Sequence, residues 1–339
     1  MNNKKATTIS TITEAILQAL KYYACDPTPL FDKAGIQLDR NNDPFSRHPV
    51  TTMTLLWQSC VEETGDEAFG LQVARCVHPT MFQALSLSAM FSDNVEQALE
   101  RLCRFSRMVS DVAEVRLEKS EDISRLVFSC FDDQAAPSPE ALDTFMASAY
   151  LLLKGVTQER VTLQSVTLKR RKPLQTKAWE DLFEATVEFD SCENILLFKT
   201  KELKIRLVSA NPQLASLNEQ VLIQYLARFD TGCIKSQVIV ELTKLLPKGN
   251  PNQQTVAQAL CMSSRTLQRR LQSLGSSFSE TLDTLRCELA AQYMQQSQLS
   301  INEISCLLGF SNPSNFNRAF KRWYHKSPGL YRSTESDHV

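Results

Sequence analysis

The chain has 339 residues, of which 43% are hydrophobic and 22% charged, and its formal net charge is −1. This composition excludes a disordered or fibrous protein, and the length predicts two domains at roughly 150 residues each. No apolar run reaches the roughly 18 residues that a membrane-spanning helix needs, and the start "MNNKKATTIS" lacks the apolar core of a secretory signal. We therefore expect a cytoplasmic protein with no membrane partner.

The first third of the chain predicts helices. Apolar residues recur there at intervals of three and four, which is typical of helices that bury one face. The segments with this pattern are residues 11–25, 53–63, 67–75, 79–91 and 94–108. Ser92 or Asp93 is the expected cap of the last one.

The pattern then changes to strands. Residues 113–131 alternate in the manner of a β-hairpin, residues 138–156 return to a helical period, and residues 161–173 predict a strand. Residues 186–203 predict a further strand pair. The first domain is therefore expected to be α+β. The basic run "LKRRKP", residues 168–173, is interpreted as an exposed loop, with a site for an anionic ligand as the alternative.

An amphipathic helix is predicted for residues 211–229, and "DTGC" interrupts it. The side chains expected on its buried side are Leu214, Leu217, Val221, Leu222 and Tyr225. We place the domain boundary near Asp230.

Ten cysteines are scattered singly, with no C-x-x-C spacing and only four histidines in the chain. This pattern excludes both a zinc site and a disulfide framework. We interpret the cysteines as small buried thiols in a reducing compartment, and we expect no metal and no cofactor.

Positive charge is concentrated near the C-terminus. Residues 235–332 contain 12 Lys or Arg against 5 Asp or Glu, whereas residues 1–234 contain 25 against 31. A basic region on an acidic body is expected when one domain approaches a polyanion and the other does not.

Two segments of this basic region share one apolar skeleton. They are residues 255–275, "TVAQALCMSSRTLQRRLQSLG", and residues 303–324, "EISCLLGFSNPSNFNRAFKRWY". Val256, Leu260, Met262 and Leu267 of the first correspond to Ile304, Leu308, Phe310 and Phe316 of the second. Each segment predicts a short helix, a tight turn and a longer helix, which begins after Ser263 in one and after Asn312 in the other. The pattern predicts two helix-turn-helix motifs.

The outer faces of the two longer helices are cationic and rich in amides. At 100° per residue, Leu271 and Leu274 lie within about 40° of Leu267, whereas Arg265, Arg269 and Gln272 lie roughly 140–200° away. In the second helix the apolar side contains Phe316, Phe320 and Trp323, and the opposite side contains Ser314, Asn317, Arg318 and Lys321. Arg pairs with guanine and Gln or Asn with adenine in the major groove, so these faces suit double-stranded DNA. The alternative is that they only solvate the helices.

Residues 277–297 predict a connecting helix of roughly 17 residues, or about 25 Å. Successive major-groove segments recur about every 34 Å along one side of B-DNA. One monomer is therefore expected to read two adjacent major-groove segments.

Residues 253–332 resemble the DNA-binding domain of the AraC/XylS family of bacterial transcription regulators. The resemblance lies in "SSRTLQRRL", residues 263–271, and in "LLGFSNPSNFNRAFKRWYHKSPGLYR", residues 307–332. It implies base contacts from Arg265, Gln268 and Arg269 in one groove and from Ser314, Asn317 and Arg318 in the next. It also places Ser264 at the DNA and assigns Gln272 and Lys321 to phosphates.

The sequence departs from the family at two positions. Cys261 stands where the family usually has Gly, at a turn that favours φ > 0, and Ser305 stands where Ala is usual. We interpret Cys261 as a packed thiol of the turn, with a redox-sensing role as the alternative.

The front of the chain resembles the N-terminal domain of the ornithine-utilisation and virulence regulators of this family, rather than the cupin barrel of the arabinose sensor. The similarity lies in residues 186–203 and the following "NPQL", and extends over about residues 25–215. It implies a sensing or dimerisation domain that binds a small effector.

These observations predict a flexible N-terminus over residues 1–10, an α+β effector-binding or dimerisation domain over 11–230, an all-α domain with two helix-turn-helix motifs over 231–332, and a flexible tail over 333–339. The expected function is that of a sequence-specific transcription activator, not an enzyme, that responds to an effector, contacts RNA polymerase and forms a homodimer. The alternatives are an enzyme or repair domain fused to a DNA-binding module, and a regulator whose front domain only dimerises.

Overall fold

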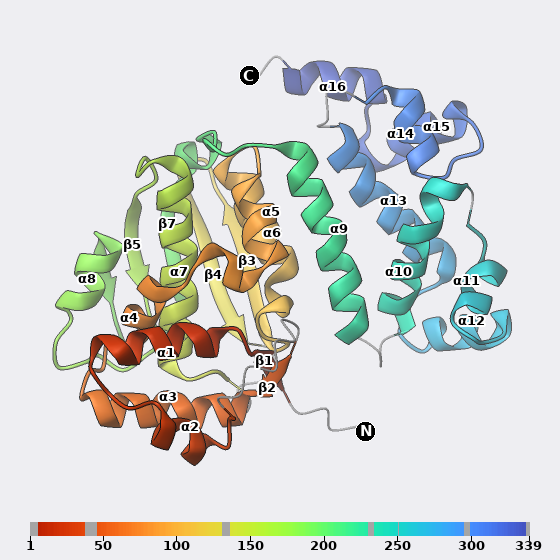
Figure 1. Cartoon of the computed structure of the whole chain (residues 1–339). Helices are drawn as coiled ribbons and strands as arrows, with labels where there is room; N and C mark the ends of the chain where they lie inside the picture. The colour runs from red at the N-terminus through yellow and green to blue at the C-terminus, as the bar shows by residue number, and fades with distance from the viewer. Residues whose placement is uncertain are drawn as a thin grey trace. The chain divides into compact units, whose positions relative to one another are not determined.

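The computed structural model describes residues 6–37, 46–130, 136–229, 234–249, 251–294 and 299–336. Internal contacts divide the chain into two units, Met1–Leu222 and Ile223–Val339. Helix α9, Pro212–Phe229, runs from the first unit into the second (Figure 1). The boundary that we predicted near Asp230 lies outside the described residues.

The first unit is built on a five-stranded sheet with the strand order β3-β4-β7-β5-β6. The strands are β3 Ala113–Lys119, β4 Ile123–Cys130, β5 Leu163–Thr167, β6 Thr186–Glu188 and β7 Asn194–Lys199. The predicted hairpin is confirmed as β3 and β4, which pair antiparallel. All other neighbours are antiparallel except β5 and β6.

Residues 186–203 were predicted to form two strands that pair with each other, and this pairing is wrong. Both strands are present, but β5 lies between them, parallel to β6 and antiparallel to β7. The connection crosses the end of β5, where the Asp190 amide donates to the Arg170 carbonyl and the Ser191 amide to the Leu168 carbonyl, each at 3.0 Å. These bonds hold the connection between β6 and β7 against the segment that follows β5.

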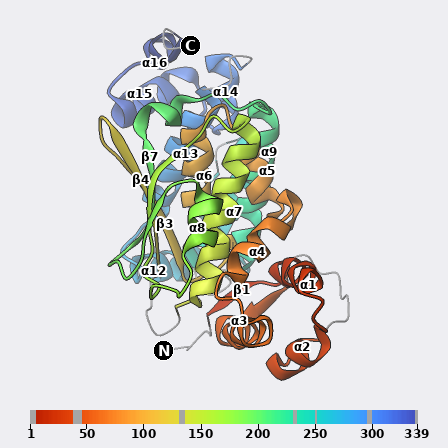
Figure 2. The same ribbon diagram turned by 90° about the vertical axis from the view of Figure 1, so that its left-hand side faces the viewer.

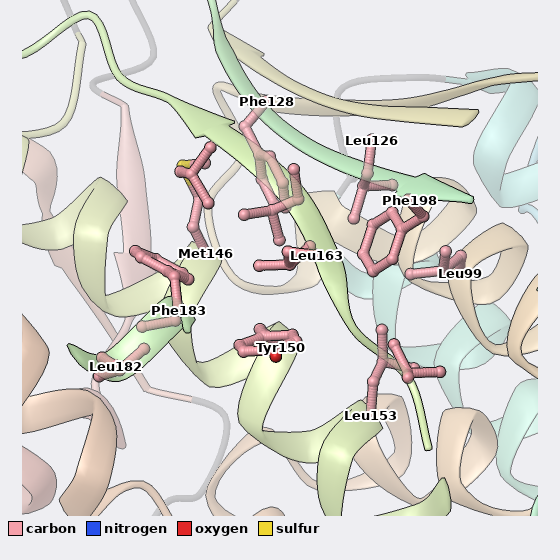
Figure 3. Packing of buried hydrophobic residues seen from close by; sticks show 14 of the residues in the cluster. Leu99, Leu126, Phe128, Met146, Tyr150, Leu153, Leu163, Leu182, Phe183 and Phe198 are labelled. Carbon is pink, nitrogen blue, oxygen red and sulfur yellow. The ribbon is translucent and has the colours of Figure 1, made fainter. Parts of the chain in front are cut away.

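Helix α7, Pro139–Thr157, forms the centre of the core on one face of the sheet (Figure 2). It begins after Ser138, whose hydroxyl accepts a hydrogen bond from the Ala141 amide, and it ends at Gln158 in the left-handed conformation. Its buried side chains pack against apolar residues of the strands and of α8, Lys177–Phe183, which the sequence did not predict. Figure 3 shows Met146, Tyr150, Leu153, Leu182, Phe183, Leu126, Phe128, Leu163 and Phe198 in this core.

Helices and two short strands complete the N-terminal part of this unit. They are β1 Thr7–Ile9, α1 Ile12–Tyr22, α2 Thr28–Ala34, β2 Arg47–Pro49, α3 Val50–Thr64, α4 Phe69–Cys76, α5 Ala84–Met90 and α6 Val95–Phe105. Residues 7–9, expected within a flexible N-terminus, thus pair with β2.

Two helix boundaries differ from the prediction. The helix expected over residues 79–91 is divided at Gln83, where φ is +48°, into a 3-10 turn, Pro79–Phe82, and α5. The cap of α6 is neither Ser92 nor Asp93 but Asn94, whose side-chain oxygen accepts from the Gln97 amide at 3.0 Å.

The buried face of α9 differs from the predicted one. Leu214, Leu217 and Val221 are exposed, whereas Ala215 and Leu222 are buried. Glu219 lies on the same buried face with 3% of its surface exposed, because Arg101 and Arg104 of α6 bind its carboxylate. An ion-paired glutamate therefore replaces part of the expected apolar stripe.

The basic segment 168–173 is not simply an exposed loop. Leu168 is buried, and Arg170 forms a buried ion pair with Asp143 of α7 while its guanidinium lies 4.6 Å from the Trp179 ring centroid. The Trp179 indole N–H also donates to Asp143 at 3.0 Å. Burial raises the pKa of Asp143 to about 6 against the opposing effect of Arg170. Arg170 therefore stabilises the fold from inside.

The second unit is helical. It contains α10 Ile234–Leu245, α11 Gln253–Ala259, α12 Ser264–Gln272, α13 Phe278–Met294, α14 Ile301–Leu307, α15 Pro313–Tyr324 and α16 Pro328–Ser336. One core joins α10 to both predicted motifs and to α13. Helix α16 extends into residues that we expected in a flexible tail. Among the described helices, none combines the length and apolar character that crossing a membrane requires.

Candidate DNA-binding surface

The first predicted motif consists of α11 and α12. Ser263 begins α12 by accepting a hydrogen bond from the Thr266 amide at 3.1 Å, as predicted. The Gln253 side chain at the start of α11 donates to the Ser264 carbonyl at 2.9 Å. Leu267 and Leu271 are fully buried against the core, whereas Leu274, which we expected beside them, is exposed because α12 ends at Gln272.

The second motif consists of α14 and α15. Ser300 and Glu303 form a reciprocal capping box at the start of α14. Asn312 begins α15 by accepting from the Asn315 amide at 2.9 Å, with Pro313 in the first turn, as predicted. Phe316 and Phe320 are buried in the same core as the leucines of α12.

The turns of the two motifs share a left-handed residue. Gly309 has φ of +65° and Cys261, at the corresponding position, has φ of +53°. The expectation that this turn favours φ > 0 is confirmed. The Cys261 thiol is exposed, however, so our interpretation of it as a packed thiol is wrong. Backbone hydrogen bonds close this turn, in which the Cys261 amide donates to the Gln258 carbonyl at 3.0 Å and the Met262 amide to the Ala257 carbonyl at 2.9 Å.

Helix α13 joins the motifs and confirms the predicted connecting helix, with 17 residues. Asp283 of α13 accepts from Arg322 of α15 at 2.5 Å and from the Trp323 indole at 3.0 Å. The Tyr324 hydroxyl donates to the Cys287 carbonyl at 2.8 Å. These bonds fix α15 on the connecting helix.

Arg286 is a positioning residue that the sequence analysis did not find. Its guanidinium donates to the carbonyls of Leu308 and Gly309 at 2.9 and 2.8 Å, and lies 4.3 Å from the Phe310 ring centroid. Burial lowers the pKa of this group. A cationic residue at an inward position of the connecting helix was the available signal, but a basic segment offers many such residues.

The predicted DNA-contacting side chains lie on the outer faces of α12 and α15. The exposed ones are Arg265, Gln268, Arg269 and Gln272 on α12, and Ser314, Asn317, Arg318 and Lys321 on α15; Ser264 is half-buried at the start of α12.

The cations of these faces are free to meet a polyanion. Among the described residues, Arg265, Arg269 and Lys321 form no ion pair, and Arg318 has one bond, to the Asn315 side-chain oxygen at 2.5 Å. Arg322, in contrast, is paired with Asp283. Two capped helices that bury one face and expose unpaired cations and amides on the other form the kind of surface that enters a major groove. The second unit is thus a DNA-binding domain with two helix-turn-helix motifs.

Comparison with known proteins gives the family. Residues 25–207, more than half of the chain, match the arabinose-binding N-terminal domain of AraC transcription regulators, and residues 256–334 match a helix-turn-helix domain family. The chain belongs to the AraC family of transcription regulators, and the predicted resemblance is confirmed.

The relatives are transcription regulators. The chain is 27% identical over 322 residues to the ornithine utilization regulator of Pseudomonas aeruginosa, covering 94% of each chain. It is 21% identical over 299 residues to the regulator VqsM of the same organism, covering 86% of this chain and 91% of the relative. The crystal structure of the regulator CdpR from P. aeruginosa is 19% identical, with a TM-score of 0.46, over 94% of this chain and 97% of that one.

Proposed function

We propose that this regulator is an effector-responsive transcription activator that reads two adjacent major-groove segments with one monomer. The observation that carries the proposal is the matched arrangement of α12 and α15, each with a buried apolar face and an exposed face of unpaired cations and amides. A solvated helix face needs no such repetition in two motifs that share one core.

The roles follow from side-chain chemistry. Arg265, Gln268 and Arg269 contact base edges in one groove segment, and Ser314, Asn317 and Arg318 contact those in the next. The fork of an Arg guanidinium matches guanine O6 and N7, and the amides of Gln and Asn match adenine N6 and N7. Ser264, Gln272 and Lys321 contact phosphates, which position the helices without carrying sequence information.

The test begins with selection of binding sites from random DNA by the full-length protein. Arg269→Ala and Arg318→Ala should each weaken binding to the selected site by about 1 to 3 kcal/mol, and change affinity for random DNA much less. Arg322→Ala is the matched control. It also removes one positive charge from α15, but the Arg322 side chain is already paired with Asp283 and is not expected to contact bases. Equal losses on selected and random DNA would reassign Arg269 and Arg318 to phosphate contacts.

Effector response requires a connection between the first unit and α9. Arg101 lies 3.5 Å from Glu219 and Arg104 also pairs with it, so α6 holds the part of α9 that belongs to the first unit. An effector acts by favouring one of two arrangements, to the extent that it binds them with different affinities.

Activation through RNA polymerase and pairing of two copies belong to the same proposal. In vitro transcription from a promoter carrying the selected site tests the first, because an activator increases transcript and a repressor decreases it. Sedimentation of the full-length protein tests the second.

A further inference from the structure

The first unit contains a cavity of about 240 Å³ among α4, the 3-10 turn Pro79–Phe82, α5, α6 and α7. Its walls are mainly apolar, with Phe82, Leu85, Leu99, Leu102, Phe145 and Leu152 among them. Leu99 and Leu153, which Figure 3 shows in the main core, also line the cavity. Sites for small ligands are concave and mostly apolar with a few polar groups, and this cavity has that character.

Two polar groups on its lining lack partners. Ser148 of α7 is 8% exposed, and its hydroxyl has no hydrogen-bond partner in the described part of the chain. Arg75, at the end of α4, is exposed, and none of the described residues forms an ion pair or hydrogen bond with its guanidinium. A buried hydroxyl without a partner costs free energy, which a ligand atom in the cavity would recover.

A neighbouring cavity lacks these features. It shares Phe82 and Phe145 with the first, and the two rings meet edge to face at a centroid distance of 6.4 Å. The hydroxyls on its lining are already bonded within the protein, as Thr54 is to the Val50 carbonyl and Thr144 to the Gly70 carbonyl. We therefore assign the ligand to the cavity that contains Ser148.

We propose that this cavity is the effector site, and that the effector is a small organic carboxylate with an apolar body. The body fills the apolar space, a polar atom on it bonds Ser148, and the carboxylate binds Arg75 at the mouth. This inference deepens the proposed function, because it names the ligand class of the responsive domain.

The lining also selects against other ligands. It contains no Asp or Glu, so an ammonium group would enter without a counter-charge. A carboxylate meets the guanidinium in a charge-assisted hydrogen bond, which is about twice as strong as a neutral one. An engineered cavity of about 150 Å³ binds benzene, so a cavity of about 240 Å³ takes a larger apolar group, such as a medium-length acyl chain.

The test uses the full-length protein without DNA and three probes of equal chain length: octanoate, 1-octanol and octylammonium. Calorimetric titration should show octanoate binding at least tenfold more tightly than 1-octanol and no binding of octylammonium. Octanoate should also raise the unfolding temperature, since it binds only the folded state. Failure of octanoate to bind, or equal binding of octanoate and 1-octanol, overturns the proposal.

Variants locate the site. Arg75→Gln should weaken octanoate binding at least tenfold and leave 1-octanol unchanged, whereas Arg171→Gln, at another exposed arginine of this unit, should change neither. Ala149→Leu narrows the cavity and should abolish binding of both probes. Ser148→Ala is the second variant, in case Ala149→Leu does not fold. It removes a hydroxyl that has no partner in the described part of the protein, so the folded state should keep its stability. Binding of 1-octanol should weaken, because its hydroxyl loses the hydrogen bond to Ser148. Unchanged octanoate binding by Arg75→Gln overturns the assignment.

A separate measurement distinguishes the site from the function. Binding of the selected DNA is measured with and without octanoate. If octanoate binds but the affinity for DNA does not change, the assignment of the ligand site is supported. The effector-responsive part of the proposed function is then contradicted. DNA binding by a protein that does not bind octanoate would contradict the site alone.

Discussion

The close approach at Gly309 gives a sharp test of how the second motif is held together. A Cβ atom built on Gly309 lies 2.8 Å from the carbonyl oxygen of Gly249 and 2.9 Å from that of Leu246. Both are backbone atoms, so neither can rotate away as a flexible side chain would. Gly309 also has φ of +65°, which disfavours any L side chain.

The two effects can be summed for Gly309→Ala. The left-handed conformation costs a non-glycine residue about 1 to 2 kcal/mol. Inserting a carbon where the backbone leaves no room costs about 1 to 3 kcal/mol. The free energy of unfolding should therefore fall by roughly 2 to 5 kcal/mol.

Gly275 and Cys261 provide matched comparisons. Gly275 has φ of +67° but nothing within 4 Å of a built Cβ, so Gly275→Ala should cost only the strain, about 1 to 2 kcal/mol. Cys261→Gly removes the backbone strain at φ of +53°, which stabilises the folded state. The glycine also makes the unfolded chain more flexible, which costs about 0.4 to 1 kcal/mol. The free energy of unfolding should therefore rise by about 1 kcal/mol.

Amide hydrogen exchange of peptides from α12 and α15 measures these changes in the intact chain, because both helices belong to one core. The expected order of stability is Cys261→Gly, wild type, Gly275→Ala, Gly309→Ala. If Gly275→Ala and Gly309→Ala lower the free energy of unfolding equally, a side chain at Gly309 does not clash with the carbonyls of Gly249 and Leu246. That result would refute the steric part of the reasoning.

Two further predictions concern buried groups of the first unit. Arg170→Gln leaves the Asp143 carboxylate buried without its cation, and should lower the free energy of unfolding by about 3 to 5 kcal/mol at pH 8. Because Arg170 lowers the pKa of Asp143, the buried carboxyl of the variant should bind a proton at a higher pH than the wild-type group, whose pKa is about 6, so this deficit should shrink as the pH falls from 8 towards 6. A deficit in urea unfolding that is constant from pH 8 to pH 5 would contradict the pairing. Burial also raises the pKa of the Cys60 and Cys103 thiols to about 12, so brief iodoacetamide treatment at pH 8 should label exposed Cys192 and spare both, as mass spectrometry of the native protein can check.

The helix-turn-helix motifs could be predicted because their signals are local. Ser263 and Asn312 sit directly before the helices that they cap, and the apolar residues recur at the helical period within one short segment. The strain of a side chain at the Cys261 turn was expected from the family resemblance, because the family usually has Gly at this position, and the corresponding Gly309 of the second motif also has positive φ. A repeated pattern allows one copy to explain the other.

The first unit was less predictable because its decisive contacts join distant segments. Glu219 looks like a solvated residue of α9 until two arginines more than 100 positions earlier bind it. Arg170 looks like part of an exposed basic run until Asp143 and Trp179 enclose it. Periodicity places apolar side chains on a face, but it carries no information about which charged residue has a buried partner.

Helix α6 connects the cavity and α9 through opposite faces. Taking Leu99 as zero and 100° per residue, Leu102 lies at about −60°, whereas Arg101 and Arg104 lie at about 200° and 140°. Leu99 and Leu102 line the cavity, and the two arginines hold Glu219. A ligand that packs against the leucines therefore acts on the same rigid element that positions the carboxylate of α9. The effect of such a ligand on DNA binding is limited by the difference between its affinities for the two arrangements of the protein, so a ligand that binds both equally well leaves DNA binding unchanged.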